Sequence, residues 1–359
     1  MSSGTASEVA SARAEEDQGQ DDECQQDWVL DVQGLTVQYL GDRPVTACNE
    51  VELQLKRGEI LGVAGESGSG KSTLITALTR LQRPPAVTTG GQILLHDRGT
   101  TYDLVPMTED ELRVHRWNTV SIVLQSAMDA LNPVLRLGAQ FADVIRAHQP
   151  RIRPTEVIDR TTELLAMVGI PANRISSYPH ELSGGMRQRA MIALALACRP
   201  RLVVMDEPTT AVDVVMQRQI VRRILRLRKQ LGFAVVFVTH DLSLLLELAD
   251  RIAIMYAGRI VEIGSSEEIY HQPKHPYTKG LRDSFPPLHA PLTKLTGIPG
   301  TPPNLGRLPP GCAFAPRCPE VHDGCTASQP ELITISDQQV ACHLYDQQHA
   351  DEARRTVGV

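Results

Sequence analysis

The chain has 359 residues, of which 42% are hydrophobic and 22% charged, and its formal net charge is -6. This composition is typical of a folded globular protein with a sizeable core, and the length favours one large domain with appendages. The acidic balance and the lack of a dense Lys/Arg tract disfavour a nucleic-acid partner, and no run of about eighteen apolar residues predicts a membrane span.

The N-terminal segment, residues 1–27, is rich in acidic and small residues and has no apolar stretch of signal-peptide length. We expect it to be a disordered tail, and we expect a cytoplasmic protein whose thiols stay reduced. Apolar and polar residues then alternate through residues 28–63, in WVLDVQGLTVQYL, VELQL and EILGVAG. This pattern predicts an antiparallel sheet that leads into a buried strand.

A glycine-rich segment, GESGSGKS, follows this strand and precedes a helical pattern from Lys71 to about Leu81, before Pro84 and Pro85. It matches G-x-x-x-x-G-K-[ST], in which backbone N–H groups face phosphate oxygens and a helix N-terminus points at the same anion. Lys71 is expected to reach the β- and γ-phosphates, and Ser72 to bind Mg²⁺. The predicted nucleotide-binding residues here are Gly65, Glu66, Ser67, Gly68, Ser69, Gly70, Lys71, Ser72 and Thr73.

Helical and strand patterns alternate along the rest of the chain up to about residue 240. Residues 120–124 predict a strand, and residues 134–169 predict a helical region with a break at HQPRIRP. The runs MRQRAMIALALACRP, RLVVMD, QIVRRILRLRKQLG and FAVVFVTH then alternate helix and strand, which is typical of βαβ units. The predicted fold class is α/β, with a P-loop and a parallel sheet.

Two of the predicted strands end in residues suited to phosphoryl transfer. RLVVMDE places Asp206 where a carboxylate can hold Mg²⁺ through water, and Glu207 where one can polarise the attacking water. His240 ends the strand FAVVFVTH, where an imidazole can stabilise charge at the γ-phosphate. Each feature alone is more often structural, but together with the P-loop they predict a nucleotide-hydrolysing site.

The segment ELSGGMRQR, residues 181–189, lies between the P-loop and the carboxylate strand. It resembles the signature of ATP-binding cassette (ABC) ATPases, and the resemblance covers residues 30 to about 270. This resemblance implies a RecA-like parallel core, an antiparallel β subdomain and a helical signature subdomain. It also implies ATP and Mg²⁺ as cofactors.

The resemblance assigns roles to further residues of the chain. Tyr39 is expected to stack on adenine, and Gln125 to bridge Mg²⁺ and a transmembrane partner. Ala211–Val212–Asp213 resembles the D-loop, and His240 the switch histidine. The signature residues expected to contact the ATP of a partner subunit are Leu182, Ser183, Gly184, Gly185 and Met186.

The signature also has a physical interpretation of its own. SGG opens a helix, so the Ser183 hydroxyl and the N–H groups of Gly184 and Gly185 form a second anion site. The two anion sites lie on separate elements, and one chain cannot place both on the same phosphate. The family's arrangement is a head-to-tail dimer that ATP binding closes and hydrolysis opens.

Four segments indicate a branch of the family: DALNPVLRLGAQ, HQPKHPYTKGL, GIPGTPPNL and PPGCAFAPRC are similar to segments of the dipeptide, oligopeptide and nickel import ATPases. The resemblance implies an ATPase subunit of a peptide importer, peripheral on the cytoplasmic face of the cell membrane. Its implied partners are a second ATPase subunit (a paralogue or a copy of itself), two transmembrane permeases and an extracytoplasmic solute-binding protein. Nickel or another small solute is an alternative cargo. A soluble, non-transport ABC ATPase is disfavoured, because those chains usually carry two cassettes or a long coiled-coil insertion.

Four cysteines, Cys312, Cys318, Cys325 and Cys342, lie in a Pro-rich region with the spacing C-x5-C-x6-C-x16-C. A zinc site usually shows closer C-x₂₋₄-C pairs, whereas a [4Fe-4S] cluster accepts wider spacing. The spacing, together with a similar motif in peptide-import ATPases, favours a [4Fe-4S] cluster over zinc, and zinc over free thiols. We therefore expect a nucleotide-binding domain at 28–270, a Pro- and Cys-rich extension with a metal cluster at 271–345, and a flexible tail at 346–359.

Overall fold

The computed structural model describes residues 28–125, 130–209, 213–284 and 297–346. The expected acidic N-terminal tail, the D-loop residues Ala211 and Val212, and residues 347–359 of the expected C-terminal tail lie outside this part of the chain.

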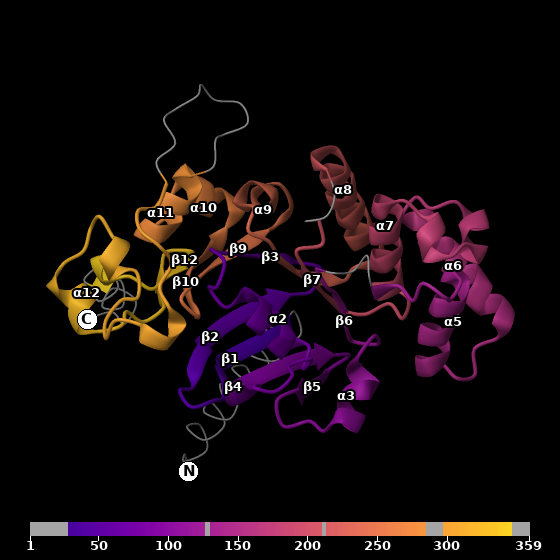
Figure 1. Cartoon of the computed structure of the whole chain (residues 1–359), viewed down its shortest axis with the longest axis horizontal. Coiled ribbons are helices and arrows are strands. Elements are labelled where there is room, and N and C mark those ends of the chain that lie inside the picture. Colours follow the sequence, from indigo (N-terminus) through magenta and orange to yellow (C-terminus); the bar gives the residue numbers. More distant parts are fainter. Residues whose placement is uncertain (1–27, 126–129, 210–212, 285–296, 347–359) are drawn as a thin grey trace, which may run out of the picture.

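An antiparallel sheet of four strands, in the order β2–β1–β4–β5, forms one layer of the fold (Figure 1). Strands β1 (Trp28–Tyr39) and β2 (Val45–Lys56) confirm the antiparallel pair that the alternating residues predict. Strands β4 (Ala86–Asp97) and β5 (Thr100–Asp103) complete the sheet. The sequence does not reveal β4, because TTGGQ interrupts the apolar alternation.

The second layer is an eight-stranded sheet in the order β11–β12–β10–β9–β3–β8–β7–β6. Its parallel part confirms the predicted βαβ architecture and the α/β fold class. Every residue of β3, β7 and β8 is buried, because both faces of the sheet are covered. The strands of this parallel part are β3 (Ile60–Ala64), β6 (Val120–Val123), β7 (Leu202–Asp206), β8 (Ala234–Val238) and β9 (Arg251–Tyr256).

Helix α2 (Lys71–Leu78) follows β3 and lies between the two sheets. It ends earlier than the expected position near Leu81. Arg80 adopts a φ of 53°, and the N–H groups of Arg80 and Leu81 turn back to the carbonyls of Ala77 and Thr76. This pair of hydrogen bonds closes the helix before the two prolines are reached.

The other helices pack mainly against the opposite face of the large sheet or form a subdomain beside it (Figure 1). A helical subdomain confirms the helical region expected at residues 134–169, with its break between His148 and Pro154. None of the helices within the described ranges is long and apolar enough to cross a bilayer. These helices are α3 (Glu109–His115), α5 (Leu137–His148), α6 (Pro154–Met167), α7 (Gly184–Ala195), α8 (Val214–Leu231), α9 (Leu242–Leu248), α10 (Ser266–His271), α11 (Pro276–Asp283) and α12 (Asp323–Ala327).

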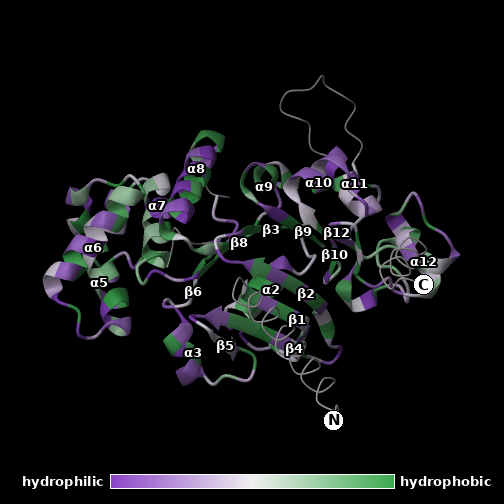
Figure 2. Ribbon diagram, turned by 180° about the vertical axis from the view of Figure 1, so that it is seen from behind, coloured by the Kyte–Doolittle hydropathy of each residue, from purple (hydrophilic) through white to green (hydrophobic). Residues whose placement is uncertain are grey.

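Two hydrophobic cores lie on the two faces of the large sheet. Successive residues of β3 point into different cores. Ile60 packs in the core that contains helices α5 to α9, whereas Leu61 and Val63 pack in the core that contains α2 and the antiparallel sheet. Figure 2 shows hydrophobic residues concentrated on α2 and on the strands beside it. The end of β3, from which the P-loop starts, is therefore held from both sides.

The Pro- and Cys-rich extension is built into the large sheet. Strand β10 (Arg259–Ser265) pairs with β12 (Gln338–Val340), which pairs in turn with β11 (Ile333–Ile335). The Pro-rich sequence gives no sign of these strands, because strands of three residues are too short to show an alternating pattern. Figure 1 shows this extension at the end of the molecule opposite to α5 and α6.

Candidate functional site

A cavity of about 790 Å³ opens at the P-loop, near the carboxyl ends of the parallel strands. Its wall combines residues from separate parts of the sequence that the motifs predict to act together: the P-loop, Tyr39, Gln125, Glu207 and His240. The lining residues are Tyr39, Val45, Ala47, Ser67, Gly68, Gly70, Lys71, Ser72, Thr73, Gln125, Glu207, His240 and Leu305.

Two glycines shape the P-loop that borders this cavity. Gly65 has a φ of 153°, and a Cβ there would lie 2.2 Å from the Met255 carbonyl oxygen. Gly70 has a φ of 107°, and its Cβ would lie 2.3 Å from the Ala47 carbonyl oxygen. Any larger residue would push the loop away from β9 and β2, so the glycines let the backbone curl tightly before α2 begins at Lys71.

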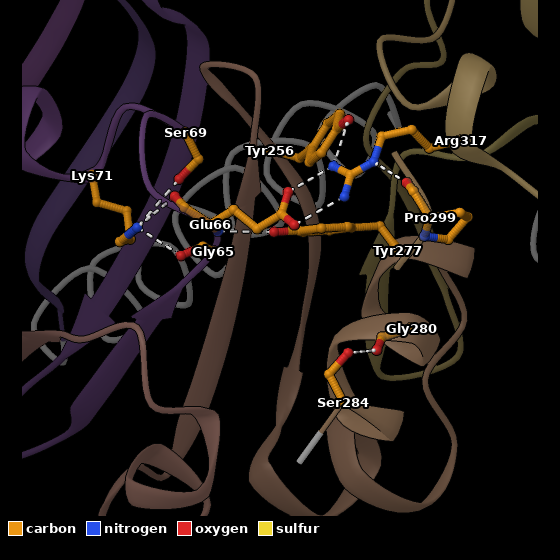
Figure 3. A network of polar contacts seen from close by, with 10 residues as sticks. All are labelled: Gly65, Glu66, Ser69, Lys71, Tyr256, Tyr277, Gly280, Ser284, Pro299 and Arg317. Atoms are coloured by element: carbon orange, nitrogen blue, oxygen red, sulfur yellow. Dashed lines mark hydrogen bonds and ion pairs between the residues drawn. The ribbon is translucent and has the colours of Figure 1, made fainter. Parts of the chain in front are cut away.

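The Lys71 ammonium rests on the P-loop itself. Its Nζ donates to the carbonyl oxygens of Gly65 (2.7 Å) and Glu66 (2.8 Å) and to Oγ of Ser69 (3.4 Å), as Figure 3 shows. Burial lowers the pKa of Lys71, while the nearby carboxylates of Glu207, Asp206 and Glu66 act in the opposite direction. The ammonium lies at the edge of the cavity, where burial disfavours its charged form more than the three carboxylates favour it.

The expected base-binding end of the cavity contains Tyr39. Its hydroxyl lies 3.0 Å from Oγ1 of Thr73, and the side chain is 39% exposed, which leaves the ring accessible from the cavity. Val45 and Ala47 of β2 and Leu305 of the C-terminal extension line the same cavity. The sequence motifs do not reveal these three apolar residues, because no local pattern distinguishes them from core positions.

The predicted acid groups lie at the carboxyl end of β7, whose last residue is Asp206. Asp206 is 8% exposed, and its pKa is raised by burial and then by the charge of Glu207. Glu207 has a φ of 43°, which is unusual for a residue with a side chain, and its carboxylate turns toward the cavity. Nε2 of Gln125 donates to Oε2 of Glu207 at 3.0 Å, and Nδ1 of His240 lies 3.1 Å from Oε1.

The predicted Mg²⁺ ligands are suitable in kind. Ser72 and Gln125 line the cavity, and the buried carboxylate of Asp206 is electrostatically coupled to Lys71. Oxygen ligands are those that Mg²⁺ prefers, and a cation there would favour the charged form of Asp206, against the burial and the Glu207 charge that raise its pKa.

The signature lies away from the cavity of its own chain. Ser183 is the N-cap of α7, and its Oγ accepts from the N–H of Met186 at 3.3 Å. The Ser183–Met186 stretch is absent from the described residues that line the cavity, so the two predicted anion sites are separate within one chain. Asp213 of the expected D-loop caps α8, where its carboxylate accepts from the N–H of Met216 at 2.9 Å.

The four C-terminal cysteines converge on one small cavity, which Cys312, Cys318, Cys325 and Cys342 line together. All four are free thiols, and burial raises the pKa of Cys342 to about 12. Within the described ranges, however, no group of three or more His, Cys, Asp or Glu side chains is arranged to hold a metal ion. The expected metal cluster therefore remains a prediction.

Two protein-family profiles match the chain. The profile described as "ABC transporter" matches residues 48–210. The profile described as "Oligopeptide/dipeptide transporter, C-terminal region" matches residues 261–325.

The alignments with curated relatives span most of this chain and nearly the whole length of each relative. A putative peptide import ATP-binding protein of Brucella ovis is 43% identical over 320 residues, covering 86% of this chain and 94% of the relative. The oligopeptide transport ATP-binding protein AppD of Bacillus subtilis is 40% identical over 330 residues, covering 90% of this chain and 99% of the relative. The oligopeptide transport ATP-binding protein OppD of Escherichia coli is 40% identical over 309 residues, covering 85% of this chain and 90% of the relative.

A solved structure is similar over the cassette. The dimeric ATP-binding cassette MJ0796, in a post-hydrolysis state bound to ADP and Pi, has a TM-score of 0.58 and 27% sequence identity. The match covers 66% of this chain and 98% of that one.

Proposed function

The chain belongs to the ABC transporter family of ATP-binding proteins, in its oligopeptide/dipeptide branch, and we propose that it hydrolyses ATP to drive import of peptides across the cell membrane. The observation that carries the proposal is the single cavity in which the P-loop, Gln125, Glu207 and His240 meet. The relatives that match nearly end to end are peptide import and oligopeptide transport ATP-binding proteins, which supports peptides as the cargo.

The proposed chemistry assigns one task to each group around the cavity. Lys71 and the P-loop N–H groups bind the phosphates, and Glu207 orients and deprotonates the attacking water. His240 stabilises charge on the γ-phosphate, and its contact with Glu207 keeps both groups on the same side of the cavity. Ser72, Gln125 and Asp206 would hold Mg²⁺, which would neutralise phosphate charge when bound.

The proposed assembly is a head-to-tail pair of ATPase subunits on the cytoplasmic face of the membrane. It is supported by the separation of the P-loop from Ser183 within the chain, and by the dimeric state of the similar cassette MJ0796. The second ATPase subunit is a paralogue or a second copy. Two permeases and an extracytoplasmic solute-binding protein complete the importer.

Uptake in cells tests the cargo. A strain lacking this gene is complemented with the wild type, with Glu207→Gln or with Glu247→Gln, whose exposed glutamate on α9 does not line the cavity. Uptake of a labelled dipeptide and a labelled oligopeptide should be lost with Glu207→Gln and restored by the other two, while nickel uptake is unchanged. Loss of nickel uptake alone would favour the nickel importer, and no change in any uptake would favour a non-transport ATPase.

We further propose that Cys312, Cys318, Cys325 and Cys342 hold a [4Fe-4S] cluster. Their spacing and their convergence on one cavity support it. Zinc sites usually show closer C-x₂₋₄-C pairs, whereas a cluster accepts the wider spacing found here. When bound, such a cluster would cross-link a region that has only a small hydrophobic core of its own.

A further inference from the structure

The C-terminal extension makes an ion pair with the P-loop. Nη1 of Arg317 lies 2.7 Å from Oε2 of Glu66, and Nη2 lies 3.0 Å from Oε1, so the guanidinium and the carboxylate meet through two parallel hydrogen bonds (Figure 3). The two residues are 251 positions apart in the sequence. Paired contacts of this kind are stronger and more directional than a single one.

The Arg317 side chain is held from several directions and is only 7% exposed. Its Nε donates to the Pro299 carbonyl oxygen at 2.7 Å, and its Nη1 also reaches the Tyr256 hydroxyl at 3.3 Å. The guanidinium lies over the rings of Tyr256 and Phe314, at 5.9 and 6.0 Å from their centroids. Arg317 is therefore a rigid anchor that β9 and the extension position together.

A second residue of the C-terminal region binds the same P-loop position. The N–H of Glu66 donates to the hydroxyl of Tyr277 on α11 at 2.9 Å. Tyr277 is fully buried, and its ring packs against Tyr256 and Phe314. Both the main chain and the side chain of Glu66 are thus tied to residues C-terminal to the cassette motifs, while its carbonyl accepts from Lys71.

The charge of Glu66 explains why this contact matters for the nucleotide. Its carboxylate belongs to the loop that receives the phosphates, and it is close enough to Lys71 to influence the pKa of that ammonium. An unpaired carboxylate there would repel the triphosphate and could take Lys71 as a partner. Arg317 compensates this charge and directs the carboxylate away from Lys71 (Figure 3).

We propose that Arg317 is a positioning residue of the ATP site, through which the C-terminal extension sets the shape and charge of the P-loop. Leu305 of the same extension lines the nucleotide cavity, which is a second, independent contact between the extension and the ATP site. The inference requires ATP binding by the chain, but not peptide import or a metal cluster. ATP binding by the wild type tests that requirement separately.

The experiment measures the Kd for ATP and the steady-state kcat and KM of the purified full-length chain. Arg317→Met should raise the Kd and KM for ATP about tenfold or more with kcat changed less than about twofold, because the interaction acts on binding and not on the hydrolytic step. The Kd and KM of Arg317→Lys should lie between those of the wild type and of Arg317→Met, since an ammonium keeps the charge but cannot make the paired contact. Lys279→Met is the matched control, because it removes another ion pair of the extension, Lys279–Glu320, that does not touch the P-loop.

The double variant Glu66→Gln/Arg317→Met decides between a positioning role and a merely structural one. Removing the carboxylate as well should restore most of the ATP affinity that Arg317→Met loses. Wild-type affinity in Arg317→Met, equal weakening in Lys279→Met, or a double variant as weak as the single one would each overturn the proposal. If Arg317→Met does not fold, Arg317→Lys and its double with Glu66→Gln are compared in the same way.

Discussion

Nδ1 of His240 lies 3.1 Å from Oε1 of Glu207, and the other carboxylate oxygen of Glu207 accepts from Gln125 at 3.0 Å. The group expected to activate water is thus held between residues that follow two other strands, β8 and β6. Its backbone, with a φ of 43°, aims the carboxylate into the cavity. We expect these contacts to rearrange when ATP and the attacking water enter.

Glu207→Gln should retain ATP binding but reduce turnover at least about a hundredfold, since a positioned general base typically contributes that much. The amide keeps the size and hydrogen-bonding reach of the side chain but cannot take a proton. ATP binding and phosphate release measured on the same preparation check this, with Glu247→Gln as the control. Near-wild-type turnover would exclude Glu207 as the base.

Ser183→Arg should abolish hydrolysis while leaving the ATP affinity of the isolated subunit unchanged. The reason is that Ser183 lies outside the cavity of its own chain and is expected to meet the nucleotide of the partner. Equilibrium ATP binding and phosphate release separate the two effects. Ser176→Arg, an exposed serine outside the signature, is the control. Equal loss of binding and turnover would place the signature in its own site.

The cysteine cavity predicts an oxygen-sensitive chromophore. Protein purified without oxygen should be brown, with absorption near about 400 nm and roughly four iron atoms per chain. Cys318→Ser or Cys325→Ser should lose the colour, because each thiolate is needed, whereas Cys198→Ser on the distant helical side should keep it. Stoichiometric zinc without iron would support a zinc site instead, and absence of metal would support free thiols.

The same cysteine variants should also weaken ATP binding through Arg317, which lies between Cys312 and Cys318. In the wild-type background, Cys318→Ser should raise the Kd for ATP several-fold, because η4 (Ala315–Arg317) leads directly into Cys318. In the Arg317→Met background it should add little, since the connection to Glu66 is already lost. Additive effects in the two backgrounds would mean that the cysteines act by another route.

His275 predicts acid sensitivity of the junction between the cassette and the extension. It is 1% exposed, and burial, followed by the charge of Lys279, lowers its pKa to about 3. Because the unfolded chain takes up a proton near pH 6.5 and the folded chain does not, the free energy of unfolding falls as the pH drops below about 6.5. The slope from this residue is at most about 1.4 kcal/mol per pH unit.

His275→Asn should remove this pH dependence. Asparagine can still accept the N–H of Tyr277, as Nδ1 of His275 does at 3.0 Å. The free energy of unfolding is measured with denaturant at pH 7.5 and at pH 5.0. Between these two pH values, the wild type should lose about 2 kcal/mol more stability than the variant. Glu262, whose pKa is raised by burial, is common to both proteins and cancels. An unchanged difference would mean that His275 is protonated in the folded chain.

The motifs of the ATP site can be predicted from the sequence because the residues of each motif are neighbours in the chain. Glycines at the P-loop and acids after β7 each carry their signal within a few residues. Asp206 ends one buried strand of the parallel sheet, and Lys71 and His240 follow two others; the carboxyl ends of such strands meet at one edge. The order of these motifs along the chain therefore predicts both the cassette fold and most of the cavity wall.

The role of the C-terminal extension could be decided only by the tertiary structure. Neither the Glu66–Arg317 pair nor the position of Leu305 in the cavity wall has a local signal, because the partners lie hundreds of positions apart and meet only when β12 adds to β10. The three-residue strands that make this connection are too short for a periodic pattern. Their place is determined by pairing with an existing sheet edge, and the charge of Glu66 then finds its partner through packing.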